Sequence, residues 1–184
     1  VADGNAEHIS VLAIGRIPML VMLGDALSDA TNVTIYHRRK PDGWGWDANA
    51  ELPELEVVKL QEGDSEKQIS LACSITASVQ QDRIPDEISG ATLYEIRPVN
   101  DEYGSHLFDA RASQAVLDKA YREFLATVER HHKNCERINL LPAIPADAAV
   151  VLGQIRTPGI DPPLDVYDFN QESDQYEFTV EVGA

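Results

Sequence analysis

The chain contains the same succession of segments twice: an apolar strand, a turn with proline, an apolar helix that carries a Leu-Gly pair, and a second strand. The first copy reads AIGRIPMLVMLGDAL and then VTIYHRR, and the second reads LPAIPADAAVVLGQI and then LDVYDFN. A strand joined to the next strand through a helix is typical of a parallel sheet with a crossover helix. Two such units in one chain predict an α/β fold with a pseudo-two-fold relation between its halves.

In the first copy, residues 8–14 form the apolar, β-branched run of a buried strand. Gly15 ends this run, and Pro18 is well placed for the first turn of a helix that continues over residues 19–30. The second strand of this copy is expected at residues 32–37.

The second copy and the middle of the chain supply the other elements. Residues 69–79 alternate apolar with small or polar side chains, which favours a strand, with a helix as the alternative. In the strand predicted at residues 91–98, Glu95 and Arg97 should face outward. The remaining elements are strands at 55–60, 137–141, 164–169 and 176–182, helices at 113–135 and from about residue 145, and a long loop at 38–54 that holds both tryptophans.

With 184 residues, the chain is long enough for one domain or for two tightly fused halves. Its hydrophobic fraction of 43% and charged fraction of 25% are ordinary for a globular protein. We therefore predict a single domain over residues 8–182, with a first half at about 8–100, a second half at 101–182, and a linker or chain edge at 1–7.

The net charge limits the partners of this chain. Fifteen Lys and Arg stand against 31 Asp and Glu, which gives a formal charge of −16. Non-specific binding to nucleic acid or to an anionic membrane needs a broad basic surface, so neither partner is expected. A specific anion pocket needs only a few local donors and is compatible with this charge. The alternative is that the charge serves solubility alone.

Three features favour a cytoplasmic protein. The longest apolar run, Ile17–Leu23, has seven residues, far below the ~18 of a membrane span. The N-terminal residues lack the basic start of a signal peptide. Cys73 and Cys135 lie outside any CxxC motif, which favours a reducing compartment, with one disulfide as the alternative.

The familiar catalytic motifs are missing: the sequence has no GxSxG, GxGxxG, HExxH or phosphate-binding GK[ST] loop. His131, His132 and Cys135 supply at most three ligands at a helix end, where histidine also favours the helix dipole, so we predict no metal site. Cys73 and Ser74 lie inside a predicted strand, whereas a nucleophile needs an exposed turn and a nearby base. We therefore predict no catalytic residues and no enzyme activity.

A binding site is better supported. In a parallel sheet, ligands lie at the carboxyl ends of the strands, and four segments converge on that edge here: 15–18, 37–46, 142–145 and 167–170. Two of them precede helix N-termini, whose free N–H groups favour phosphate. Arginines and aromatic rings gather in the same segments and suit a nucleotide. The alternative is a solvated basic loop with its tryptophans packed on the core.

The two matched segments resemble the SAVED domain, the cyclic-oligonucleotide sensor of bacterial CBASS anti-phage systems. That family carries a helix with a Leu-Gly pair and a W-x-W-like loop, then a F-P-A-x-P-like turn, an A-V-x-L-G-R-like helix and a V-Y-D strand. The last three read LPAIP at residues 141–145, AVVLGQ at 149–154 and VYD at 166–168. Gln154 stands where the family pattern has Arg, and Leu141 stands where it has Phe.

The resemblance implies an α/β fold of two fused CARF-like, Rossmann-type halves with mainly parallel central sheets and flanking helices. A cyclic oligonucleotide would bind across the junction of the halves, without a cofactor or metal and without being altered. Binding would drive self-association and activate a fused effector, for which a DNA endonuclease is expected. The compact size is most similar to the HNH-endonuclease-fused type, which implies a cyclic dinucleotide, with a cyclic trinucleotide as the alternative.

The resemblance also implies roles for residues at the predicted edge. Arg16, Arg38 and Arg39 would meet phosphates, to which arginine offers bidentate geometry. Aromatic side chains would stack on bases, and backbone N–H groups near the two turn prolines would take a phosphate or a base edge. The predicted ligand-binding residues are Arg16, Pro18, His37, Arg38, Arg39, Trp44, Trp46, Pro142, Ala143, Pro145, Tyr167 and Asp168.

Two other functions stay open for this sequence. The first is a ring nuclease-like relative of the CARF proteins that degrades the cyclic messenger, which the appearance of a linear product would reveal. The second is an interaction module without a ligand. Such a module would dock a partner through the acidic stretch from Asp161 onward, where seven acids occur without a base.

Overall fold

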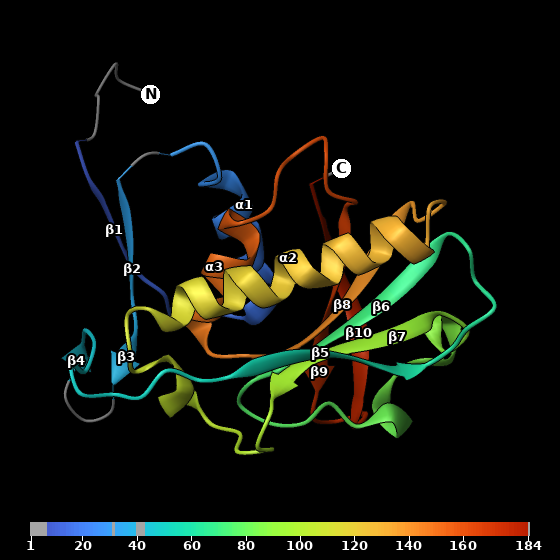
Figure 1. Cartoon of the computed structure of the whole chain (residues 1–184), viewed down its shortest axis with the longest axis horizontal. Coiled ribbons are helices and arrows are strands. Elements are labelled where there is room, and N and C mark those ends of the chain that lie inside the picture. The colour runs from blue at the N-terminus through green and yellow to red at the C-terminus, as the bar shows by residue number, and fades with distance from the viewer. Residues whose placement is uncertain (1–6, 31, 40–42, 184) are drawn as a thin grey trace.

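The computed structural model describes residues 7–30, 32–39 and 43–183, so most of the linker predicted at residues 1–7 lies outside the described residues. The large sheet consists of β5 (Leu55–Gln61), β6 (Gln68–Ser74), β7 (Thr92–Pro98), β8 (Arg137–Ala143), β9 (Leu164–Asn170) and β10 (Gln175–Val182). Its six strands have the order β10-β9-β8-β6-β7-β5 (Figure 1). β6 pairs in parallel with β7 and β8, and β8 with β9, while β5 and β10 are antiparallel edges.

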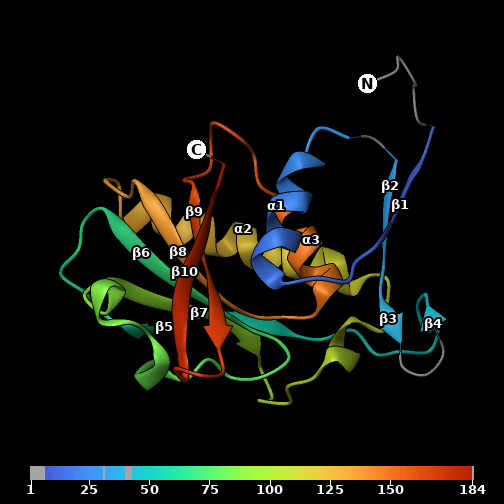
Figure 2. The same cartoon turned by 180° about the vertical axis from the view of Figure 1, so that it is seen from behind.

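The first predicted β–α–β unit is present, and it stands beside the large sheet. β1 (Ile9–Leu12) and β2 (Val33–Tyr36) pair in parallel as a separate two-stranded sheet, joined through α1 (Ile17–Ala26). Pro18 lies in the first turn of α1, as the sequence predicts. Figure 2 shows this pair of strands to one side of the large sheet, with α1 between the two.

The second β–α–β unit lies inside the large sheet. β8 and β9 are parallel neighbours, and α3 (Ala146–Gln154) connects them. The strand predicted at residues 137–141 continues further, so Pro142 and Ala143 belong to β8 rather than to the turn. Both repeats thus form parallel β–α–β units within a mixed α/β fold, which confirms the predicted fold class. The division into halves near residue 100 stays a prediction.

The two repeats meet where α1 packs on α3. Gly24 of α1 lies against the backbone of α3, because a Cβ added there would overlap the carbonyl oxygen of Val150. Gly153 of α3 lies in the same way against the carbonyl oxygen of Val21 in α1. The Leu-Gly pair recurs in both copies because each helix needs a residue without a side chain at the crossing.

The longest helix, α2 (Ser113–His131), packs on β5, β7 and α3 and covers part of the large sheet (Figure 1). The helix ends at His131, before the end that was predicted at Cys135. Its buried side chains recur every three or four residues, as in an amphipathic helix, and include Leu117, Tyr121, Phe124 and Val128. Within the described residues, no helix combines the length and apolar character needed to cross a bilayer.

In the middle of the chain, the predicted strand is confirmed rather than its alternative, a helix, but this strand, β6, already ends at Ser74, before the predicted end at residue 79. The outward orientation predicted for Glu95 is wrong. Glu95 of β7, predicted to face outward, is only 3% exposed and accepts a hydrogen bond from the Ser74 hydroxyl at 2.5 Å. β7 lies between β6 and β5, and nearly all of its residues are buried, so alternation along the strand does not bring Glu95 to water.

The segments predicted as irregular contain short elements. The loop at residues 38–54 holds a small antiparallel hairpin of β3 (Arg38–Arg39) and β4 (Gly43–Trp44). The backbone N–H of Gly45 donates to the carbonyl oxygen of His37 at 3.0 Å, which ties the hairpin to the end of β2. Three 3-10 turns follow later in the chain: η1 (Gln81–Arg83), η2 (Asp86–Ile88) and η3 (Ser105–Phe108).

Candidate functional site

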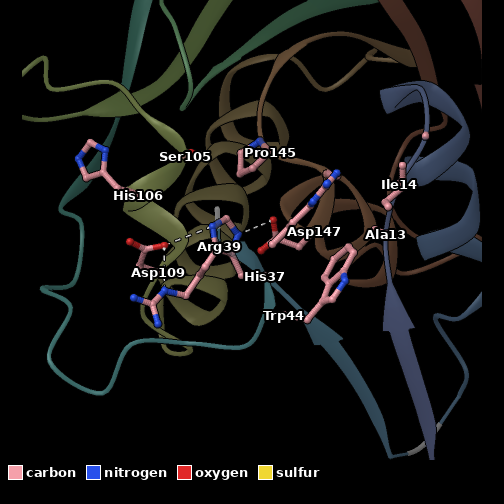
Figure 3. Close-up of a pocket in the computed structure, with 13 residues that line it drawn as sticks. Ala13, Ile14, His37, Arg39, Trp44, Ser105, His106, Asp109, Pro145 and Asp147 are labelled. Carbon is pink, nitrogen blue, oxygen red and sulfur yellow. Dashed lines mark hydrogen bonds and ion pairs between the residues drawn. The ribbon is translucent and has the colours of Figure 1, made fainter. Parts of the chain in front are cut away.

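A cavity of about 510 Å³ opens where the first repeat meets the start of α3 (Figure 3). It lies at the carboxyl ends of β1 and β2, the edge at which parallel sheets bind ligands. A further wall comes from the segment around η3. The lining residues are Ala13, Ile14 and Gly15 after β1; His37, Arg38, Arg39 and Trp44 after β2; Ser105, His106 and Asp109 from the η3 segment; and Pro145, Ala146 and Asp147 at the start of α3.

His37 connects the polar groups of this cavity. It directly follows β2, and its side chain is buried. Its Nδ1 lies 2.9 Å from Oδ1 of Asp147, and its Nε2 lies 3.4 Å from Oδ1 of Asp109. Because both ring nitrogens face carboxylates, the imidazole links α3 to the η3 segment and leaves neither nitrogen for a ligand.

Asp147 lies in the first turn of α3, where the helix dipole stabilises a negative charge. The residue lines the cavity and is only 2% exposed. Its Oδ1 is paired with His37, whereas its Oδ2 has no hydrogen-bond partner among the described residues. A buried carboxylate oxygen without a donor is costly, so the polar network of the cavity is incomplete at this atom.

The two arginines of β3 have different surroundings. The Arg39 side chain is 28% exposed, with Nη2 3.1 Å from Oδ2 of Asp47 and Nε 4.0 Å from Oδ1 of Asp109. Arg38 is exposed where it lines the cavity. The site therefore combines accessible positive charge from one short strand with the buried carboxylate of Asp147 and the partly exposed carboxylate of Asp109.

The two tryptophans also differ. Trp44 is half-buried and lines the cavity. Trp46 lies outside the lining and stacks on Tyr36 with the ring centroids 4.9 Å apart. The guanidinium carbon of Arg111 lies 5.1 Å from the centroid of the Trp46 ring. For Trp46, the structure therefore favours packing on the end of β2, the alternative that the sequence left open.

Other predicted ligand-binding residues lie outside the cavity lining, and their contact with a ligand stays a prediction. Arg16 and Asp168, which are 152 residues apart, form an ion pair with Nε 2.8 Å from Oδ2. Tyr167 is 4% exposed, and its ring packs edge-on against Phe178. Of the predicted set, the cavity gathers His37, Arg38, Arg39, Trp44 and Pro145, while Pro18, Pro142 and Ala143 lie within α1 and β8.

The acids of the cavity, Asp109 and Asp147, were not among the residues predicted from the sequence. Asp147 follows Pro145 closely, so its place at the start of a helix was readable from the turn. Asp109 and His106 come from a segment without regular apolar spacing, and no signal in it indicated that it folds beside β2.

The cluster at the end of α2 is engaged with its surroundings. His132 Nε2 lies 2.9 Å from the Tyr94 hydroxyl oxygen, and burial lowers the pKa of His132. The Cys135 thiol donates to the Arg137 carbonyl oxygen at 3.4 Å. These contacts fit a packed helix end, and no group of three potential metal ligands occurs within the described residues.

Comparison with protein families gives the class of this chain. The family described as "SMODS-associated and fused to various effectors sensor domain", SAVED, matches residues 1–182. The chain belongs to the SAVED family. Comparison with curated proteins finds no match.

Three solved structures share the fold, all of the SAVED/CARF-domain containing receptor Cap4 from Acinetobacter baumannii. The structure with the cyclic trinucleotide 2′3′3′-cAAA has a TM-score of 0.73 and 19% identity, over 98% of this chain and 39% of the receptor. The structure with 3′3′3′-cAAA has a TM-score of 0.72 and 16% identity, over 98% of this chain and 40% of the receptor. A third structure of the receptor has a TM-score of 0.63 and 14% identity, over 96% of this chain and 37% of the receptor. This chain therefore spans about two fifths of the receptor's length.

Proposed function

We propose that this chain is the ligand-binding module of a larger sensor and binds a cyclic oligonucleotide in the cavity beside His37. The observation that carries the proposal is the position of this cavity, at the carboxyl ends of β1 and β2 and against the N-terminus of α3, where the two repeats meet. Membership of the SAVED family supports a sensor role, and two of the related Cap4 receptor structures hold a cyclic trinucleotide.

The cavity offers both charge and a stacking surface. Arg38 is exposed and can meet a phosphate with bidentate geometry. Arg39 adds positive charge beside it, within reach of Asp47 and Asp109. Trp44 offers a ring on which a base can stack. Because these side chains belong to one short hairpin, they suit the close succession of phosphate and base in an oligonucleotide.

In this proposal, the ligand changes the association of the protein and is not itself altered. A ligand shifts an equilibrium only if it binds two states with different affinity. A cyclic ligand that contacts β3 and the start of α3 touches both repeats, so it can favour one arrangement of the two. In that arrangement the chains self-associate and activate a fused effector, with an endonuclease as the expected one from the family resemblance.

A thermal-shift panel of cyclic di- and trinucleotides with 3′–5′ and 2′–5′ linkages tests this function. A ligand at about 100 times its Kd stabilises the protein by about 2.7 kcal/mol, which raises Tm by several degrees. A shift of that size with one compound would support the proposal. If the protein is folded and no compound changes its Tm, the proposal is contradicted. Analysis of the incubated compound for linear product separates a sensor from a ring nuclease.

Variants then locate the site. We expect Arg39→Ala and Trp44→Ala to weaken binding by about tenfold or more while the protein stays folded. Arg83→Ala is the matched control, because Arg83 is paired with Asp174 and lies outside the cavity lining. Wild-type affinity in all three variants would show that the ligand binds elsewhere.

A further inference from the structure

We propose that the carboxylate of Asp147 reads the base of the bound ligand by accepting a hydrogen bond from its exocyclic amino group. This inference rests on the proposed function, because it names the part of the ligand that occupies this end of the cavity. It favours cyclic nucleotides of adenine, cytosine or guanine over those of uracil, whose base has no amino group and offers only its ring N3–H as a donor.

One carboxylate oxygen of the cavity lacks a hydrogen-bond partner among the described residues. Asp147 is 2% exposed, and it lines the cavity. His37 occupies its Oδ1 at 2.9 Å, while its Oδ2 has no partner among the described residues. Native proteins rarely bury a charged acceptor without a donor, because the lost hydration is not replaced. A donor on the ligand would replace it.

The contacts of His37 hold this carboxylate in position. An ionised carboxylate only accepts hydrogen bonds, so Nδ1 of His37 donates to Asp147. Nε2 of the same ring lies 3.4 Å from Oδ1 of Asp109, which restrains the imidazole from its other side. Figure 3 shows His37 between the two carboxylates, with Trp44 on the Asp147 side of the cavity. Oδ2 is thus left for a base that stacks at Trp44.

Charge decides which part of an oligonucleotide can meet Asp147. A phosphate beside this carboxylate would bring two negative charges together, which is strongly unfavourable in a partly buried site. The arginines of β3 line the same cavity and attract the phosphates instead. The donors that remain are amino groups on the base edges, the ring N–H of guanine and uracil, and free ribose hydroxyls. Of these, the amino group of a base that stacks at Trp44 is the one assigned to Asp147. The sequence left two possible contacts for the start of α3, a phosphate or a base edge. We therefore assign the start of α3 to a base edge.

The first arm of the test compares ligands that differ only in the amino group. Wild-type protein is titrated by calorimetry with 3′3′3′-cAAA and cyclic di-adenylate, and with the same rings built from purine riboside, which lacks the adenine amine. We expect loss of the amine to weaken binding about ten- to hundredfold, as for one good base contact. If another base is preferred in the panel, the comparison uses that base and its counterpart without the amine.

The second arm changes the protein. Asp147→Asn keeps the shape of the side chain and removes its charge, so we expect it to bind the two ring types within about twofold of each other. Asp165→Asn is the matched control, because it also removes a largely buried carboxylate, the partner of Arg137, but Asp165 lies outside the cavity lining and the variant should keep the preference for the amine. Melting curves establish that both variants are folded, and the first arm needs no variant.

The outcomes separate this inference from the function on which it rests. If wild-type protein binds no cyclic nucleotide, the proposed function fails and the inference fails with it. If the ligand binds but the amine makes no difference, or if Asp147→Asn keeps the full preference, Asp147 does not read the base and the sensor function stands. A preference for cyclic uridylates would overturn the inference in the same way.

Discussion

Gly24 of α1 and Gly153 of α3 occupy the same position in the two repeats, and each lies against the backbone of the opposite helix. A Cβ on Gly24 would overlap the carbonyl oxygen of Val150, and a Cβ on Gly153 would overlap that of Val21. Such a reciprocal contact is what the two-fold relation predicted from the sequence would produce. Because α3 begins at the cavity, the crossing also sets where Asp147 stands relative to the end of β2.

We expect Gly153→Ala to destabilise the protein by about 1–3 kcal/mol, because the added methyl group must displace helix backbone. Gly90→Ala is the control, since no atom lies within 4 Å of a Cβ added at that position. Urea unfolding followed by circular dichroism measures both variants. Equal midpoints would show that α1 and α3 can separate without cost.

Arg156, which follows α3, joins the two helices through a buried ion pair. Its side chain is fully buried, with Nη1 2.5 Å from Oδ1 of Asp25 at the end of α1 and Nη2 3.2 Å from the Pro162 carbonyl oxygen. Removing one partner of a buried pair leaves the other charge uncompensated. The Asp25 side chain keeps 22% exposure, so we expect Arg156→Met to cost about 3 kcal/mol, the lower end of the usual range.

An exposed pair supplies the control for Arg156. Arg83 and Asp174 lie 3.4 Å apart with both side chains accessible to water, and Arg83→Ala should cost about 0–1 kcal/mol. Both variants can be compared by urea unfolding at one pH and salt concentration. If Arg156→Met unfolds at the same urea concentration as Arg83→Ala, the buried pair does not hold the repeats together.

The two β–α–β units could be predicted because the information that defines them is local. Apolar spacing, Gly15 and Pro18 lie within one short segment, and the parallel pairing of β1 with β2 follows from the crossover. That β1 and β2 form their own sheet could not be predicted, because membership of a sheet depends on pairing between distant segments. Glu95 shows the same limit, since its burial depends on what covers β7.

Five of the twelve predicted ligand-binding residues line the cavity, and they follow from the rule that ligands lie at the carboxyl ends of strands. His37, Arg38 and Pro145 were found in this way. The rule does not say which residues at that edge pair with one another. Arg16 and Asp168 both lie there in the sequence, but in the folded chain they contact each other rather than the cavity.

The two cysteines should differ in reactivity. Burial raises the pKa of the Cys73 thiol to about 12, so thiolate is scarce at any ordinary pH and no reagent reaches it. Burial also raises the pKa of Cys135, which is partly exposed. We expect maleimide at pH 7.5 to label Cys135 slowly in native protein and both cysteines in urea, as counted by mass spectrometry. Rapid native labelling of Cys73 would show that β6 opens readily.

The protein should lose stability in mild acid through His132. Burial, the largest cause, lowers its pKa in the folded state below the ordinary 6.5. Between these two values the unfolded chain binds a proton that the folded chain does not, so folding is disfavoured as the pH falls below about 6.5. His132→Gln removes this contribution. Its urea midpoint should therefore fall less than that of wild type between pH 7.5 and 5.5.

The neighbouring histidine, His131, supplies the control for His132. His131→Gln removes the exposed neighbour at the same helix end and should keep most of the wild-type dependence on pH, because burial is the largest cause of the His132 shift. Glu62 opposes the shift of His132, while His131 and Lys59 support it, so the measurements need constant ionic strength. Parallel curves for wild type and His132→Gln would show that the imidazole stays accessible to protons in the folded chain.

The two tryptophans should separate stability from ligand binding. Trp46 stacks on Tyr36 and has the Arg111 guanidinium over its ring, so Trp46→Ala should cost about 2 kcal/mol. Trp46→Phe keeps a ring for Tyr36 and should recover part of that loss. Trp44 lines the cavity instead, and Trp44→Ala should change the urea midpoint little while weakening binding of the cyclic nucleotide. If Trp44→Ala unfolds the domain, its indole belongs to the core and the stacking surface for the base must be sought elsewhere.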